Sequence, residues 1–226
     1  MEPIINITFL VSYSGSGGVE VITNNLCAGL VAAGNNVTVL LIRNNSPHLE
    51  NLNAQIKQIK LRSSSTWTAL PEITRYLKNH NPDVFIAVKD RGIRVAAAAR
   101  ILSGYQGLML GQLHNNMIVG LANRGRITRE IRYAAMRKLY PRLDYIIAVS
   151  EDAATAARTI TKIDRERFSV LPNPVITPTV QTQSERPATH PWLRDSDVPV
   201  IVGIGRLSPQ KNFSLLLKAF ALVLQT

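Results

Sequence analysis

Short apolar runs rich in β-branched residues alternate with longer stretches of helical periodicity along most of this chain. The apolar runs fall at residues 4–11, 36–42, 56–61, 83–88, 107–113, 144–149 and 168–171, and they have the length of buried strands. A strand returns to the same edge of a parallel sheet only through a right-handed crossover, which needs a helix. The alternation therefore predicts an α/β fold, a Rossmann-like doubly wound parallel sheet, over residues 1–176.

The rest of the chain has a different composition. Residues 177–197 are rich in Pro, Thr, Ser and Gln and show little periodicity, which is typical of a linker between domains. Residues 198–226 predict one strand, at 200–204, and one helix, at 215–224. A single strand and helix have no second layer on which to bury an apolar face. This last segment is therefore expected to dock on another surface.

Charge and cysteine content bound the class of protein. Of 226 residues, 46% are hydrophobic, and the formal net charge is +11, which indicates an anionic partner such as a phosphorylated ligand, a membrane surface or a nucleic acid. The one cysteine, Cys27, excludes an internal disulfide and is expected to be a buried thiol in a reducing compartment. Without a long apolar run or a cationic start, the sequence predicts a cytoplasmic protein.

Two cations follow the strand predicted at 200–204. Arg206 and Lys211 lie in the segment Gly-Arg-Leu-Ser-Pro-Gln-Lys-Asn-Phe, at residues 205–213. They come after the carboxyl end of a strand and before the amino end of a helix, where unpaired N–H groups favour an anion. The segment therefore predicts a phosphate site.

This segment resembles the opening signature of the nucleotide-binding half of family 4 glycosyltransferases, which are retaining enzymes of the GT-B fold. The resemblance implies that residues 1–176 are the acceptor-side domain, and that residues 198–226 begin a second, truncated Rossmann-like domain. It implies that Arg206 and Lys211 hold the diphosphate of a UDP- or GDP-linked sugar, with no cofactor and no metal. The family's Glu-x7-Glu motif has no counterpart, because no acid follows Asp197. This chain is therefore expected to bind nucleotide sugar weakly and to be weakly active or inactive alone.

A loop dense in glycine follows the first predicted strand. It contains Gly15, Gly17 and Gly18, but its spacing lacks the third glycine of the dinucleotide fingerprint, so binding of NAD is weakly supported. From the residues alone, a phosphate-facing loop and a tight turn both stay open. The resemblance implies that Gly17 and Gly18 match a Gly-Gly pair that faces the donor diphosphate.

Two further loops follow strands at the edge of the sheet where ligands gather in open α/β folds. His114 comes directly after the strand at 107–113, and a lone loop histidine is often only a surface residue. The resemblance implies that His114 belongs to the catalytic site and positions the sugar, with Asn115 beside it. Lys89 and Asp90 follow the strand at 83–88, either as acceptor contacts or as a solvated turn.

A basic helix is predicted within residues 127–140. At about 100° per residue, four arginines fall on one side and four apolar residues on the other: Arg126, Arg129, Arg132 and Arg137 against Ile127, Ile131, Ala134 and Ala135. The helix either packs on the sheet with a solvated cationic face, or its arginines contact anionic lipid headgroups. Several family members that glycosylate lipid or envelope acceptors bind membranes in this way. Nucleic acid is disfavoured, because few aromatic residues interleave with the cations.

These patterns lead to one main hypothesis and two alternatives. The main hypothesis is a glycosyltransferase that moves a sugar, with retention, from a nucleoside-diphosphate donor to a hydroxyl of a glycan or lipid-linked acceptor. It would act in envelope or surface polysaccharide synthesis, in the cytoplasm or at the inner face of the membrane. The first alternative is a non-catalytic remnant that binds acceptor or membrane. The second, a sugar-nucleotide epimerase on the same scaffold, lacks recognisable catalytic acids.

Overall fold

The computed structural model describes residues 3–13, 17–50, 52–194, 199–208 and 211–225. The chain divides into two units, Met1–Val175 and Ile176–Thr226, which are described separately. Among the helices of the described residues, none combines the length and apolar content needed to cross a bilayer.

The first unit is built on a seven-stranded parallel sheet with the order β3-β2-β1-β4-β5-β6-β7. The strands are β1 (Asn6–Tyr13), β2 (Asn36–Asn44), β3 (Lys57–Lys60), β4 (Val84–Val88), β5 (Leu108–Leu113), β6 (Tyr145–Ala148) and β7 (Phe168–Val170). Each lies within two residues of an apolar run in the sequence, so the predicted doubly wound Rossmann-like sheet is confirmed. The strand order reverses between β1 and β4, which is the switch point where such sheets bind ligands.

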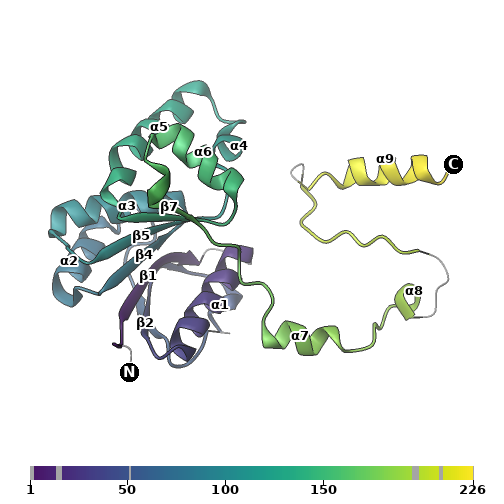
Figure 1. Ribbon diagram of the computed structural model, residues 1–226, viewed down its shortest axis with the longest axis horizontal. Coiled ribbons are helices and arrows are strands. Elements are labelled where there is room, and N and C mark those ends of the chain that lie inside the picture. Colours follow the sequence, from purple (N-terminus) through teal and green to yellow (C-terminus); the bar gives the residue numbers. More distant parts are fainter. Residues whose placement is uncertain (1–2, 14–16, 51, 195–198, 209–210, 226) are drawn as a thin grey trace. The chain divides into compact units, whose positions relative to one another are not determined.

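Helices cover both faces of this sheet (Figure 1). They are α1 (Gly18–Ala32), α2 (Leu70–His80), α3 (Lys89–Ser103), α4 (Met117–Leu121), α5 (Arg126–Leu139) and α6 (Glu151–Thr161), with short 3-10 turns η1 (Pro47–Leu49), η2 (Tyr140–Arg142) and η3 (Arg165–Arg167). Helix α1 packs on one core, which holds the buried Cys27, and α2, α3, α5 and α6 pack on the other. Alternate side chains of β1 enter the two cores, with Phe9 in one and Leu10 in the other, because strand side chains alternate between faces.

Helix α5 is rotated relative to the sequence prediction. Its inner face is a stripe at helical spacing, formed by the half-buried Arg129, Arg132 and Tyr133 and the buried Met136. The exposed fractions of Ile127 and Ile131 are 78% and 65%, so the prediction that these isoleucines pack on the sheet was wrong. Tyr133 and Met136 join the core that α2, α3 and α6 share. Their burial decides the rotation of the helix, and it carries two arginines inward.

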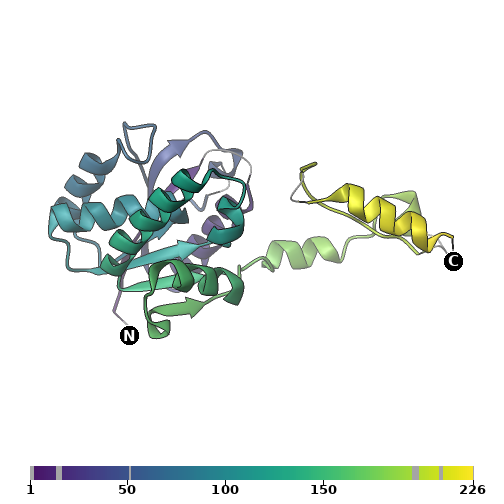
Figure 2. The ribbon, with the colours of Figure 1, turned by 90° about the horizontal axis from the view of Figure 1, so that it is seen from above.

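The described residues of the second unit form three helices, α7 (Pro178–Ser184), α8 (Pro191–Arg194) and α9 (Phe213–Val223), which Figure 1 labels. Helix α9 is the yellow helix of Figure 2. Helix α9 confirms the helix predicted at 215–224. Residues 199–204 form no strand, so the strand predicted at 200–204 is not present, and Ile204 is 88% exposed. A strand is stabilised by hydrogen bonds to a neighbour, and the described residues of this unit contain no strand that could supply them.

Candidate functional site

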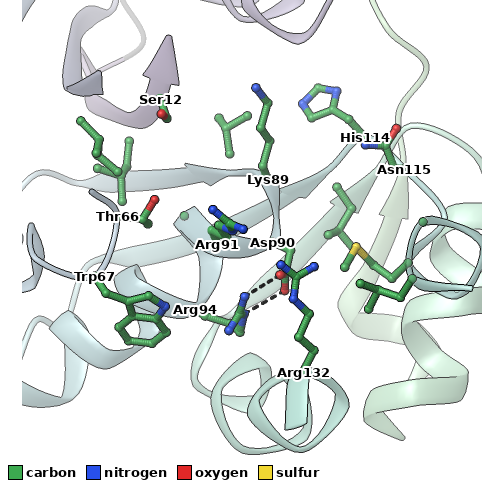
Figure 3. Close-up of a pocket in the computed structure, with 18 of the residues that line it drawn as sticks. Ser12, Thr66, Trp67, Lys89, Asp90, Arg91, Arg94, His114, Asn115 and Arg132 are labelled. Atoms are coloured by element: carbon green, nitrogen blue, oxygen red, sulfur yellow. Dashed lines mark hydrogen bonds and ion pairs between the residues drawn. The ribbon is translucent and has the colours of Figure 1, made fainter. Parts of the chain in front are cut away.

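A pocket of about 600 Å³ opens at the carboxyl ends of the central strands. Its lining includes a residue near the end of each of four neighbouring strands: Ser12 of β1, Ile42 of β2, Val88 of β4 and Leu113 of β5. The loop before α2, the first turns of α3 and α4, and one residue of α5 complete the wall (Figure 3). The pocket therefore lies at the switch point of the sheet, and its volume is in the range of small-molecule sites.

Lys89 enters this pocket from an unusual backbone conformation. The sequence suggested a turn here, but Lys89 is the first residue of α3 and has a positive φ of 66°. Such a conformation costs a non-glycine residue about 1–3 kcal/mol and is typical of functional sites. Its Nζ lies 3.1 Å from Oε1 of Glu20, a carboxylate on α1 that is nearly fully buried. The ion pair thus holds Lys89 in place at the edge of the pocket.

Glu20 is a site residue that the sequence interpretation missed. It sits in the first turn of α1, where an acid is normally read as a favourable partner of the helix dipole. A Cβ on Gly17 would lie 2.8 Å from Oε2 of Glu20, so the glycine leaves room for this carboxylate. Gly18 is the first residue of α1, and a Cβ added to it would have no atom within 4 Å. The sequence does place an acid directly after Gly-Gly-Val, but it does not indicate that this acid pairs with Lys89.

Asp90 is part of a buried hydrogen-bonded network. Nε and Nη2 of Arg94 lie 3.0 and 2.8 Å from the two carboxylate oxygens of Asp90, and the hydroxyl of Tyr140 donates to Oδ1 over 3.1 Å. Burial first, and then the charge of Asp90, raise the pKa of Tyr140 well above its ordinary value. The guanidinium of Arg94 also lies 5.8 Å from the centre of the Trp67 ring. Asp90 therefore fixes Arg94 and Trp67 on the wall of the pocket.

His114 is held as a neutral imidazole at one end of the pocket. Burial first, and then the positive charge of Lys89, lower the pKa of His114 to about 4. A side-chain hydrogen bond with Asn173 opposes part of this shift. Both His114 Nε2 and Asn173 Oδ1 are buried. His114 and its exposed neighbour Asn115 both line the pocket, as their positions after β5 suggested.

The pocket carries an excess of positive charge. Its lining contains five basic side chains, Arg43, Lys89, Arg91, Arg94 and Arg132, and one acid, Asp90. The sequence interpretation gave Arg132 to a membrane surface and assigned no role to Arg43 or Trp67. These residues come from β2, the loop before α2, and α5, and only the fold brings them together.

The remaining predicted residues lie elsewhere. Arg126 is exposed, and Arg137 is exposed with its Nε donating to the carbonyl of Ile160 over 3.0 Å. Arg206 and Lys211 are exposed residues of the second unit, whereas Gly17 and Gly18 belong to the first. Among the described residues, no group of three or more His, Cys, Asp or Glu side chains is placed to hold a metal ion.

The fold agrees with what comparison with known proteins found. A family model described as Glycosyltransferase Family 4 matches residues 16–177, which is more than half of the chain. The protein therefore belongs to glycosyltransferase family 4. A search of curated protein sequences found no match.

Solved structures with the same fold include three proteins of sugar metabolism. A lipopolysaccharide outer core galactosyltransferase, WaaB, is 18% identical, with a TM-score of 0.54 over 75% of this chain and 46% of its own. Anabaena HepE in complex with UDP-glucose is 15% identical, with a TM-score of 0.56 over 80% of this chain and 50% of its own. Sucrose-phosphate synthase from Thermosynechococcus elongatus is also 15% identical (TM-score 0.56, 74% and 47%). The chain thus spans about half the length of these structures.

Proposed function

We propose that this chain is the acceptor-side part of a glycosyltransferase that moves a sugar from a nucleoside-diphosphate donor to an acceptor hydroxyl with retention. The observation that carries the proposal is the cationic pocket at the switch point, with a neutral His114 at its end. Membership of family 4 and the UDP-glucose in the HepE structure support a nucleotide-sugar donor. The acceptor would be a glycan or lipid-linked glycan of the cell envelope.

Different residues would bind the diphosphate and the sugar. Backbone N–H groups at Gly17 and Gly18 would approach the donor diphosphate, because no side chain intervenes. Arg206 and Lys211 would neutralise the charge that develops on the leaving diphosphate, which is the kind of electrostatic stabilisation that lowers a barrier most. The neutral imidazole of His114 would bind a sugar hydroxyl, since a neutral ring can both donate and accept a hydrogen bond.

The test is an amide chemical-shift map of the 226-residue chain with UDP, UDP-glucose and GDP-mannose. We expect weak binding, with shifts at Gly17, Gly18, Arg206 and Lys211 for every ligand that carries a diphosphate. Only ligands that also carry the sugar should shift His114. The His114→Gln variant should lose the sugar-dependent part, whereas His80→Gln, at an exposed position on α2, should retain it. Submicromolar binding would contradict the expected weakness of donor binding by this chain, and a map that avoids both glycine and cation positions would refute the proposal.

A second candidate function is docking on an anionic membrane, and it is favoured by the rotation of α5. Ile127 and Ile131 are one turn apart on the helix, so they share a face, and both are exposed. The exposed Arg124 and Arg126 lie beside them in the sequence. Exposed apolar side chains next to cations are what an interfacial helix presents to lipid. This function would serve a lipid-linked acceptor, or it would stand alone if the chain is a non-catalytic binding module.

Vesicle sedimentation tests this candidate. The protein should pellet with vesicles of phosphatidylglycerol and phosphatidylcholine, and the Ile127→Ser/Ile131→Ser variant should lose most of this binding. Arg124→Glu/Arg126→Glu should lose it as well, because each cation near the surface contributes about 1 kcal/mol. The exposed pair Arg75→Glu/Lys78→Glu on α2 is the charge-matched control. Equal pelleting of all variants would exclude α5 as the docking surface.

A further inference from the structure

The charge of the pocket narrows the class of acceptor, provided that the proposed transfer function holds. We infer that the acceptor carries a phosphate or carboxylate group, which Arg91 and Arg132 bind. The cations of the pocket divide into those that a carboxylate of the protein neutralises and those that no such carboxylate reaches within the described residues.

Two of the five cations have a carboxylate partner within the protein. Arg94 forms a two-pronged ion pair with Asp90, the one acid of the lining, and Lys89 pairs with the buried Glu20. These pairs leave no acid in the described lining to balance the other three cations. Arg43 donates its Nε to the carbonyl of Ser64 over 2.8 Å, which orients the side chain without neutralising its charge.

Arg91 and Arg132 are the two cations best placed to bind a ligand. Within the described residues, neither has a carboxylate within ion-pair distance. Arg91 lies in the first turn of α3, directly after β4, and Arg132 lies on the inner stripe of α5 that Met136 turns toward the core. Both arginines line the same pocket as Asp90 and Arg94 (Figure 3).

The guanidinium group is suited to an oxyanion and poorly suited to a neutral sugar alone. Its planar fork matches two oxygens of a phosphate or carboxylate, and such charge-assisted hydrogen bonds are about twice as strong as neutral ones. Uncompensated cations that line one pocket repel each other, and an anionic group in the ligand relieves that repulsion. Trp67, which is 43% exposed, adds an aromatic surface next to this charge for the apolar face of a sugar ring.

The described lining of the pocket does not include the glycines assigned to the donor. Gly17 and Gly18 are not part of the described lining, which extends instead along β2 and the loop before α2, to Arg43 and Trp67. An anion held by Arg91 and Arg132 would thus occupy the acceptor side of the site.

Fluorescence of Trp67 provides a direct test. The chain has two tryptophans, so a Trp192→Phe background leaves Trp67 as the sole reporter within the pocket. The probes are glucose 6-phosphate, glucuronate, glucose and UDP, each titrated into the 226-residue chain. We expect glucose 6-phosphate or glucuronate to change the fluorescence with a Kd at least about tenfold lower than that of glucose, a ratio that corresponds to about 1.4 kcal/mol.

Single-charge variants locate the anion. Arg91→Gln and Arg132→Gln should each raise the Kd for the anionic sugar by about tenfold and leave that for glucose unchanged. Arg75→Gln, which removes an exposed cation of α2 outside the pocket, is the matched control and should have no effect. A far-UV circular dichroism spectrum equal to that of the parent protein shows that each variant is folded.

The outcomes separate this inference from the proposed function. Equal affinity for glucose and its anionic analogues would overturn the inference and leave a neutral acceptor in the same pocket. The inference would also be overturned if UDP bound more tightly than glucose 6-phosphate and if its Kd depended on Arg91 and Arg132 in the same way. Both arginines would then be assigned to the donor. No saturable change with any probe would overturn the inference too, while the shift map with UDP-glucose would still decide the transfer function.

Discussion

The buried pair of Asp90 and Arg94 makes a quantitative prediction about the stability of the first unit. Asp90 is 9% and Arg94 7% exposed, and Asp90 also accepts the hydroxyl of Tyr140. The change Asp90→Ala leaves a buried guanidinium and a buried hydroxyl without their acceptor. Removing one partner of a buried ion pair costs about 3–5 kcal/mol, because the other charge stays in the interior unpaired.

The assay is urea unfolding in the Trp192→Phe background. Trp67 lies 5.8 Å from the Arg94 guanidinium, so its fluorescence reports on the unit that holds the pair. We expect the free energy of unfolding to fall by about 3–5 kcal/mol in Asp90→Ala. For a chain of this size the melting temperature should fall by about 6–20 °C, at roughly 2–4 °C per kcal/mol.

Two further variants decide whether the cause is the unpaired charge. Asp90→Ala combined with Arg94→Met should recover most of the loss, since apolar replacement of both partners is often nearly neutral. Glu151→Ala removes the ion pair between Glu151 and Arg158, in which the Glu151 side chain is 60% exposed. This variant should lower the free energy of unfolding by less than about 1 kcal/mol. If Asp90→Ala costs no more than Glu151→Ala, or if the double variant is less stable than Asp90→Ala, the reasoning about this network is refuted.

Three other predictions concern single groups in the first unit. Burial lowers the pKa of His114 to about 4, so between about pH 6.5 and 4 the histidine is protonated in the unfolded chain but not in the folded protein. The free energy of unfolding should therefore fall as the pH drops through this range. The variant His114→Asn should show a weaker dependence on pH, and an NMR titration that gives the His114 ring of the folded protein a pKa near 6.5 would contradict the prediction. Burial raises the pKa of Cys27 to about 12, so a thiol reagent should label the folded protein far more slowly than the protein in urea; equal rates would show an accessible thiolate. Ser150→Ala removes the side-chain cap on the N–H of Ala153 and should cost about 1 kcal/mol in urea unfolding, whereas Ser103→Ala on α3 should cost less.

The sequence alone predicted the architecture because that information is local. Apolar runs of strand length and stretches of helical spacing are visible without knowledge of any neighbour, and their alternation leaves a parallel doubly wound sheet as the fold. It also predicted that His114 and Lys89 would follow strands at the ligand-binding edge, since the carboxyl ends of parallel strands share one edge. The burial of Cys27 was a local prediction of the same kind.

Pairing and rotation could not be predicted in this way. The apolar run at 200–204 has the composition of a strand, but a strand also needs a hydrogen-bonding neighbour, which the described residues of its unit do not contain. The face of α5 that turns inward depended on Tyr133 and Met136 finding space in the core. The distribution of charges around the helix does not show that burying Tyr133 and Met136 stabilises the fold more than burying Ile127 and Ile131 would.

The chemistry of the pocket was decided by the tertiary structure. Glu20 and Lys89 are 69 residues apart, and Arg91 and Arg132 come from different helices, so their meeting depends on the order of the strands. The amino-acid sequence by itself determined that this chain forms a Rossmann-like sheet, with His114 and Lys89 in loops at the edge where such sheets bind ligands. Only the folded chain decided which cations are neutralised and which face the pocket, because a charge acts through its distance from other charges in space and not through its position in the sequence.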